Sequence, residues 1–77
     1  MKDIIQGCIR KDKSSYKQLY DLFSSKMLTI CRIYTRNNED AQDVFQTGFI
    51  RIFENISQLK EPAALEWWMK KIFINES

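Results

Sequence analysis

One stripe of apolar side chains constrains the fold of this chain more than any other feature of its sequence. Apolar or small residues recur at three- and four-residue steps between positions 41 and 56, namely Ala41, Val44, Phe45, Gly48, Phe49, Ile52, Phe53 and Ile56. This spacing is that of one face of an α-helix, so other elements must cover it. A glycine inside a helix costs about 1 kcal/mol relative to alanine. At Gly48 we therefore expect a close approach of another helix.

Two helices are predicted before this stripe. A short first helix is indicated by apolar residues that share one face, namely Ile4, Ile5, Cys8 and Ile9. Asp12 follows a charged run and is placed to cap a second, long helix. The apolar stripe of that long helix comprises Tyr16, Leu19, Tyr20, Phe23, Met27, Ile30, Cys31 and Tyr34.

The starts of the third and fourth helices are also marked in the sequence. Asn37 and Asn38 interrupt the pattern, and the acidic residues Glu39 and Asp40 suit the first turn of the helix that follows. Residues 57–61 form a short polar segment, after which Pro62 suits the first position of a fourth helix. The inward stripe of this helix comprises Leu65, Trp68, Met69, Ile72 and Phe73.

Composition limits the chain to one all-α domain. Its 77 residues, 44% of them hydrophobic, suffice for one small core. Only two glycines and one proline are present, and the β-branched residues follow helical spacing, which argues against a sandwich or barrel. We therefore predict a small bundle of three long helices plus a short N-terminal helix.

The chain contains no histidine, which argues against an enzyme. The usual general base, the histidine-containing catalytic triads and the histidine-containing zinc sites are thereby removed. We expect a non-catalytic domain with no metal and no cofactor. Cys8 and Cys31 fall on apolar helix faces and are expected to be buried free thiols. No signal-peptide core or membrane-spanning apolar run is recognisable, so we expect a cytoplasmic protein.

Charge is unevenly distributed along the chain. Residues 10–36 carry seven Lys or Arg against two Asp, whereas residues 37–66 carry six acids against Arg51 and Lys60. Ordinary solvated helix faces explain this pattern, and so do two partners of opposite electrostatic character. Charge alone does not decide between the two explanations.

Two groups of residues are left outside the predicted core. The third helix places Asp43, Gln46, Thr47, Ile50, Arg51 and Glu54 on its outer side, a polar set around an exposed aliphatic residue that suggests a docking surface. The fourth helix leaves Trp67, Lys70, Lys71, Ile74 and Asn75 outside. An exposed ring beside lysines suits single-stranded nucleic acid, because bases stack on the ring and ammonium groups bind phosphates. A solvated face with one stray isoleucine remains the alternative for the third helix. For the fourth helix, the alternative is that Trp67 packs against the preceding loop.

The order of these features resembles region 2 of bacterial sigma factors of the extracytoplasmic-function (ECF) type. The resemblance rests on the run from Asp40 to Phe53 and the run from Trp67 to Asn75, both read along consecutive helices. Members of that family carry an Asp-Ala-Glu-Asp-Leu-x-Gln-Glu-x-Phe run followed by a Trp-Leu-x-Arg-Ile-Ala-x-Asn run. Thr47 stands where an acid is usual, and Lys71 stands in place of the usual Arg.

The resemblance implies a function for each group of outward residues. The residues expected to dock on the clamp-helix coiled coil of the largest RNA polymerase subunit are Asp43, Gln46, Thr47, Ile50 and Arg51. The residues expected to recognise and melt the −10 promoter element, by binding its non-template strand, are Ser57, Gln58, Leu59, Lys60, Trp67, Lys70, Lys71 and Asn75. An anti-sigma factor is a further candidate partner.

The resemblance covers nearly the whole chain, so residues 1–77 are expected to form one region 2 domain. The family's second helical domain, region 4, which reads the −35 element, has no counterpart here. We expect an excised N-terminal domain, because residues 75–77 end inside a recognisable motif, and a truncated protein is the alternative. The competing functional hypothesis is a helical protein-interaction module that uses the same faces without binding DNA.

Overall fold

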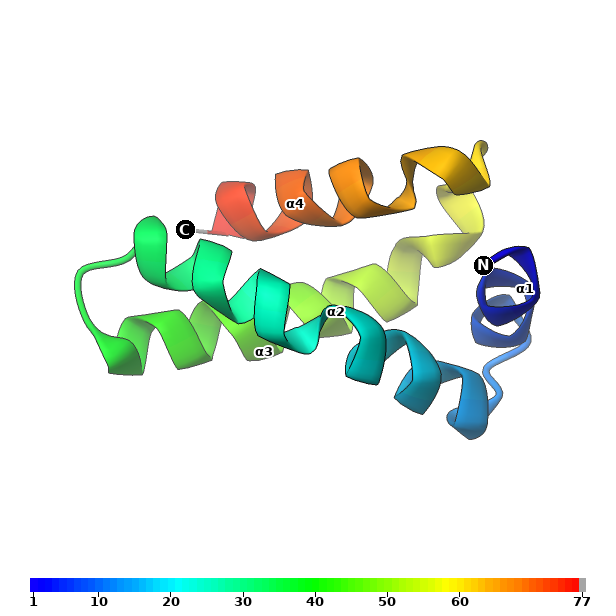
Figure 1. Ribbon diagram of the computed structural model, residues 1–77, viewed down its shortest axis with the longest axis horizontal. Coiled ribbons are helices and arrows are strands. Elements are labelled where there is room, and N and C mark those ends of the chain that lie inside the picture. Colours follow the sequence, from blue (N-terminus) through cyan, green and yellow to red (C-terminus); the bar gives the residue numbers. More distant parts are fainter. Residues whose placement is uncertain (77) are drawn as a thin grey trace.

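The computed structural model describes residues 1–76, and these form helices joined by short connections (Figure 1). The predicted domain also includes Ser77, which lies outside the described residues. The elements in chain order are α1 (Lys2–Ile9), α2 (Lys13–Ile33), α3 (Asn38–Asn55), the 3-10 turns η1 (Ile56–Gln58) and η2 (Pro62–Ala64), and α4 (Leu65–Glu76). Within the described residues there is no strand. The prediction of an all-α bundle with three long helices and a short N-terminal helix is confirmed.

Side-chain caps mark the starts of α2 and α3. The Asp12 carboxylate accepts a hydrogen bond of 3.1 Å from the Ser14 amide and caps α2. The Asn37 side chain likewise accepts a 2.8 Å hydrogen bond from the Asp40 amide at the start of α3. Both caps satisfy an amide that has no partner inside the first turn of its helix. The cap predicted at Asp12 is confirmed, whereas the sequence pattern marked Asn37 only as an interruption between two helices.

The connection between α3 and α4 is more ordered than the polar loop predicted for residues 57–61. Its first residues continue from α3 as the 3-10 turn η1. Pro62 begins a second 3-10 turn, in which the Glu61 side chain accepts a hydrogen bond from the Ala63 amide. The α-helix itself begins three residues later, at Leu65, because the chain first completes this tight turn.

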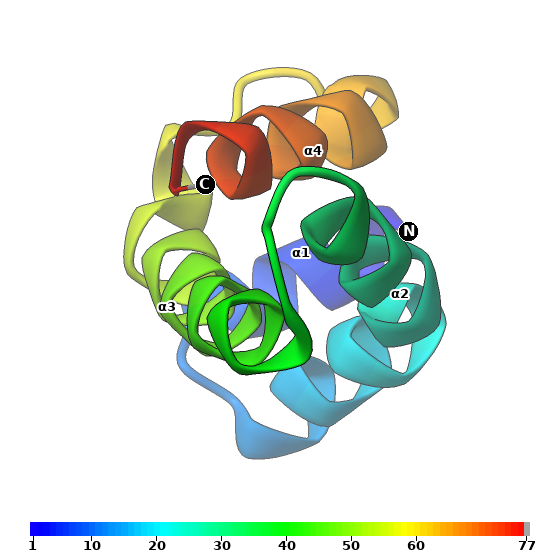
Figure 2. The same cartoon turned by 90° about the vertical axis from the view of Figure 1, so that its left-hand side faces the viewer.

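The three long helices surround a single core. Viewed end-on, α2, α3 and α4 lie at the corners of a triangle, and α1 lies behind them (Figure 2). Helix α1 packs against α2 and η1, at the end of the bundle where α2 begins and α3 ends. The most completely buried large side chains are Phe73, Leu19, Met27, Ile52, Ile56, Leu65 and Met69. Cys8 and Cys31 are buried free thiols, as predicted.

Some residues assigned to the predicted stripes are exposed at the edge of the core. Tyr20 and Tyr34 are exposed, and so is Ile9 at the end of α1. Tyr34 is the C-cap residue of α2, where the chain has already left helical geometry. Tyr20 lies at the margin of α2, where its ring contacts Phe45 and Phe49 of α3 with one side open to solvent. Helical periodicity alone does not locate the margin of a buried face.

Candidate functional site

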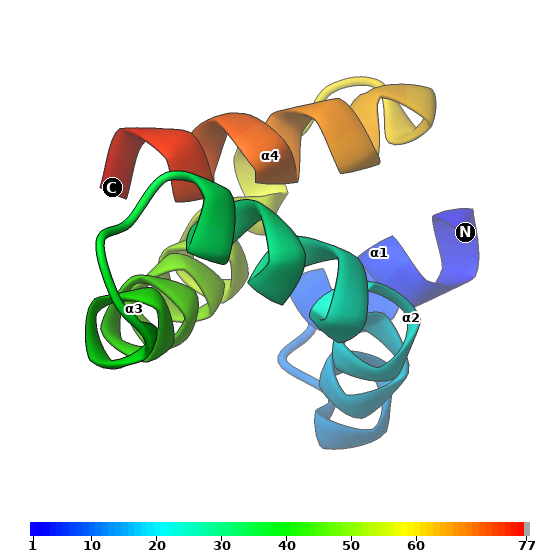
Figure 3. The same ribbon diagram turned by 60° about the vertical axis from the view of Figure 1, so that its left-hand side comes forward.

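The outward-facing side of α4 comprises Trp67, Lys71 and Ile74 and is called its crest below. It brings an aromatic ring and a lysine into contact. Trp67 is 63% exposed, and the Lys71 ammonium lies 5.0 Å from the centroid of its ring, a cation–π contact. Ile74 follows one further turn along the same side and is also exposed. Figure 3 shows α4 lying across α2 and α3, with no described element on its outer side. The crest therefore presents a flat apolar ring next to a positive charge.

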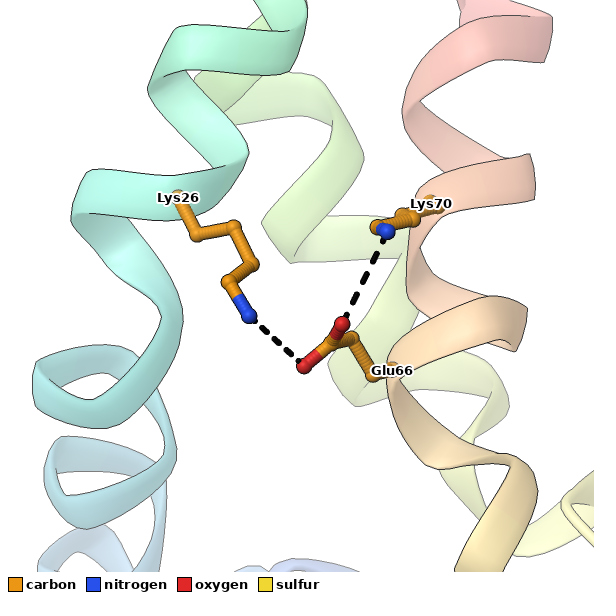
Figure 4. Close-up of polar contacts among 3 residues, drawn as sticks. All are labelled: Lys26, Glu66 and Lys70. Carbon is orange, nitrogen blue, oxygen red and sulfur yellow. Dashed lines mark hydrogen bonds and ion pairs between the residues drawn. The ribbon is translucent and has the colours of Figure 1, made fainter.

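The flank of α4 that faces α2 holds a network of three charged side chains (Figure 4). The Lys26 Nζ of α2 lies 3.0 Å from Oε1 of Glu66, and the Lys70 Nζ lies 3.6 Å from Oε2 of the same carboxylate. The hydrogen bond from Lys26 is the largest of the effects that lower the pKa of Glu66 below its ordinary value. Lys26 was not among the predicted site residues, because it lies on a different helix, 40 positions from Glu66.

Asn75 lies on the opposite flank of α4 from Lys70. The two residues are five positions apart, which corresponds to about 140° around an α-helix. Asn75 is exposed, and its neighbour Glu76 forms an ion pair with Arg51 of α3. The predicted DNA-binding residues of α4 thus divide into a crest with Trp67 and Lys71 and two flanks.

The segment before α4 places the remaining predicted DNA-binding residues at one end of the bundle. Ser57, Gln58 and Lys60 are exposed, and the Gln58 side chain donates a 3.2 Å hydrogen bond to Asn55 Oδ1. Leu59 is half-buried and packs against the core, beside a groove that α1 and this segment line together. Leu59 therefore anchors the segment, while its polar neighbours remain accessible.

The outer face of α3 carries the residues predicted to dock on polymerase. Asp43, Gln46 and Ile50 are exposed, and Ile50 exposes 58% of its surface. Thr47 is half-buried. Arg51 is exposed, but its guanidinium pairs with the Glu76 carboxylate of α4, so its charge is partly neutralised within the domain.

An aromatic groove runs between α2 and α3 next to this face. The ring centroids of Tyr20 and Phe49 are 5.2 Å apart, and those of Tyr20 and Phe45 are 5.9 Å apart. Gln46 and Ile50 line the same groove. The sequence pattern placed these rings in the core and did not predict an accessible groove. The groove forms because the edges of α2 and α3 meet without a third element covering them.

The two candidate surfaces face different directions. The outer sides of α3 and α4 belong to different corners of the triangle in Figure 2. Within residues 1–76, no helix is long and apolar enough to cross a bilayer. The same residues contain no cluster of three or more Cys, Asp or Glu side chains that could hold a metal ion.

Comparison with protein families gives one match. Searches of curated proteins and of solved structures found no significant match. The model of the family described as sigma-70 region 2 matches residues 19–77, which include all of α3 and α4 and most of α2. Because this match covers well over half of the sequence, the chain belongs to the sigma-70 region 2 family, whose domains are non-catalytic and act in transcription initiation.

Proposed function

We propose that this domain is region 2 of an ECF-type sigma factor, which docks on the clamp-helix coiled coil of RNA polymerase and recognises and melts the −10 promoter element. The domain comprises residues 1–77 and acts in the cytoplasm. The observation that carries the DNA-binding part is the exposed ring of Trp67, with the Lys71 ammonium held against it. Such a pair offers a stacking surface for a base and a cation for the neighbouring phosphate.

Promoter melting requires no chemistry from the protein. A base inside a duplex has its faces covered by its neighbours, so only an unstacked base can lie on the ring of Trp67. Stacking on an aromatic side chain is worth roughly 1–3 kcal/mol for each base, comparable with the few kcal/mol that unpairing costs. Binding to the open strand therefore shifts the equilibrium from duplex to melted DNA. Ser57, Gln58 and Lys60 before α4, and Asn75 on one flank of α4, provide exposed polar groups for further base or backbone contacts.

Docking on polymerase is supported by the outer face of α3. Asp43 and Gln46 provide exposed polar groups, and Ile50 adds an apolar contact at the rim of the aromatic groove. An apolar residue surrounded by polar ones is the usual composition of a protein-binding patch. Thr47 and Arg51 complete the proposed contact, with Arg51 retaining its ion pair to α4. The competing function, a protein-interaction module without DNA binding, uses this face and the face with Trp67 for protein contacts.

The experiment that tests docking is a pull-down with a purified clamp-helix coiled coil from a bacterial RNA polymerase of the same source. We expect the wild-type chain to be retained, and Asp43→Lys and Gln46→Ala to reduce retention while leaving the helical circular dichroism unchanged. Asp21→Lys is the matched control, because Asp21 is an exposed acid on a different helix, α2. Failure of the folded wild type to bind would refute docking.

The experiment that tests DNA binding measures the affinity for a single-stranded oligonucleotide at several salt concentrations. We expect the dissociation constant to rise steeply with salt, because each phosphate contact contributes about −0.7 to the logarithmic slope on single strands. Retention on the coiled coil with no DNA affinity at low salt would favour the interaction module.

A further inference from the structure

The ion network at the α2–α4 boundary joins three charged side chains from two helices. Two ammonium groups from different helices, Lys26 and Lys70, converge on the two oxygens of one carboxylate, Glu66. All three side chains are about half-exposed. Exposed ion pairs contribute little to stability, because solvent screens them and two long side chains must be ordered. Helix α2 packs against α4, and both helices contribute buried core residues such as Met27 and Met69, so the ion network is not needed to hold them together.

The position of the network connects it with the DNA-binding crest. Lys70 lies three residues after Trp67, so it is a neighbour of that ring on the helix surface. Lys26 extends the positive charge from α4 onto α2, along the flank opposite Asn75. Glu66 pairs with both lysines and offsets one of their two positive charges. The lysines lower its pKa, so the carboxylate is charged at neutral pH.

We propose that Lys26 and Lys70 form a binding site for a backbone phosphate of single-stranded DNA, and that the Glu66 carboxylate occupies this site until DNA displaces it. An ammonium group donates hydrogen bonds to any anionic oxygen within about 3 Å, so a phosphate oxygen can replace a carboxylate oxygen as its partner. This inference rests on the proposed DNA-binding function and extends its surface to a second helix. Glu66 then acts as an intramolecular competitor that weakens binding to every nucleic acid. Strands that also stack on Trp67 overcome this competition best.

The test measures the fluorescence anisotropy of a labelled single-stranded DNA oligonucleotide with the full chain. We expect Glu66→Gln to bind about three- to fivefold more tightly than wild type at low salt. This ratio corresponds to the free energy of one exposed ion pair, which DNA no longer has to break. The matched control is Asp21→Asn, which releases Lys17 from an equivalent exposed pair on α2 and changes net charge equally. We expect the affinity of this control to stay close to that of wild type.

A second variant tests the lysine that links the two helices. We expect Lys26→Met to weaken binding and to reduce the logarithmic salt slope by about 0.7, the contribution of one phosphate contact on a single strand. Lys17→Met, the control of equal charge on the same helix, should leave the slope unchanged. Circular dichroism establishes that each variant is folded.

The outcomes separate this inference from the proposed function. If wild type binds DNA and Glu66→Gln gains no more affinity than Asp21→Asn, the phosphate site is refuted while DNA binding stands. An unchanged salt slope for Lys26→Met would likewise refute the phosphate site and leave DNA binding in place. If neither wild type nor Glu66→Gln binds the oligonucleotide at low salt, DNA binding by this domain is refuted, and the phosphate site with it.

Discussion

The ring of Phe73 on α4 packs directly against the backbone of Gly48 on α3. A Cβ atom at position 48 would lie 2.4 Å from both Cδ1 and Cε1 of that ring, closer than any real contact. Phe73 is fully buried and also contacts the rings of Phe45 and Phe49. The close approach expected from a glycine inside an apolar stripe is therefore present, and it determines how near α4 lies to α3.

Replacing Gly48 by alanine should destabilise the domain. Alanine improves helix propensity by about 1 kcal/mol, but forcing an extra methyl into a packed core costs about 1–3 kcal/mol or somewhat more when a buried ring must move. We expect a net loss of about 1–2 kcal/mol, measured as a lower urea midpoint. In a double-mutant cycle, Phe73→Leu should remove most of the penalty of Gly48→Ala. A higher midpoint for Gly48→Ala alone would contradict the packing.

The two thiols should be unreactive while the domain is folded. Burial raises the pKa of Cys8, with a further contribution from Asp12, and burial also raises the pKa of Cys31. Since the thiolate is the reactive form, we expect slow reaction with an aromatic disulfide reagent at pH 8 and fast reaction in urea. The same shifts predict stability that is lost as pH rises from about 8.5, the ordinary thiol pKa, through the folded pKa. Equal rates in the folded and unfolded chain would show that the thiols are accessible.

The carboxyl group of Glu66 should titrate below its ordinary pKa. The hydrogen bond from Lys26 is the main cause, and the charges of Lys26 and Lys70 add to it. Because the folded pKa is depressed, the associated stability is present above the unfolded pKa and is lost as pH falls through the folded value. Carbon-detected NMR titration should show the pKa rising in Lys26→Met, and rising less in Lys70→Met, whose ammonium lies farther away. Equal pKa values in wild type and Lys26→Met would exclude the contact in solution.

Substitution of Trp67 should weaken DNA binding without weakening the fold. Trp67 is largely exposed, whereas its neighbour Trp68 is partly buried against the core. We expect Trp67→Ala to lose about 1–3 kcal/mol of binding free energy for a single-stranded oligonucleotide, the value of one stacked base. Trp67→Phe should keep a substantial part of it, because a ring remains. The melting temperature of both variants should stay close to that of wild type. Unchanged affinity in Trp67→Ala would exclude stacking on this ring.

The helices and most of their faces were predictable from the sequence because they depend on local interactions. Asp12 and Asn37 cap their helices through hydrogen bonds to amides two or three residues away. The apolar stripes recur within one or two turns, so their spacing records which face is buried. The outward position of Trp67 beside Lys71 follows from the same periodicity, and so does the exposure of Ile50. Gly48 also indicated a close contact, though not its partner.

Other features were decided only by the tertiary structure. The pairing of Lys26 with Glu66 joins residues 40 positions apart, and the pairing of Arg51 with Glu76 joins α3 to α4. The aromatic groove beside Tyr20 depends on where the edges of α2 and α3 meet. The spacing of residues within one helix specifies its faces, but the angle and offset at which helices cross arise from the packing of many side chains together. Contacts between the flanks of different helices follow from those angles, and so the charge network at the edge of the crest could not be read from the sequence.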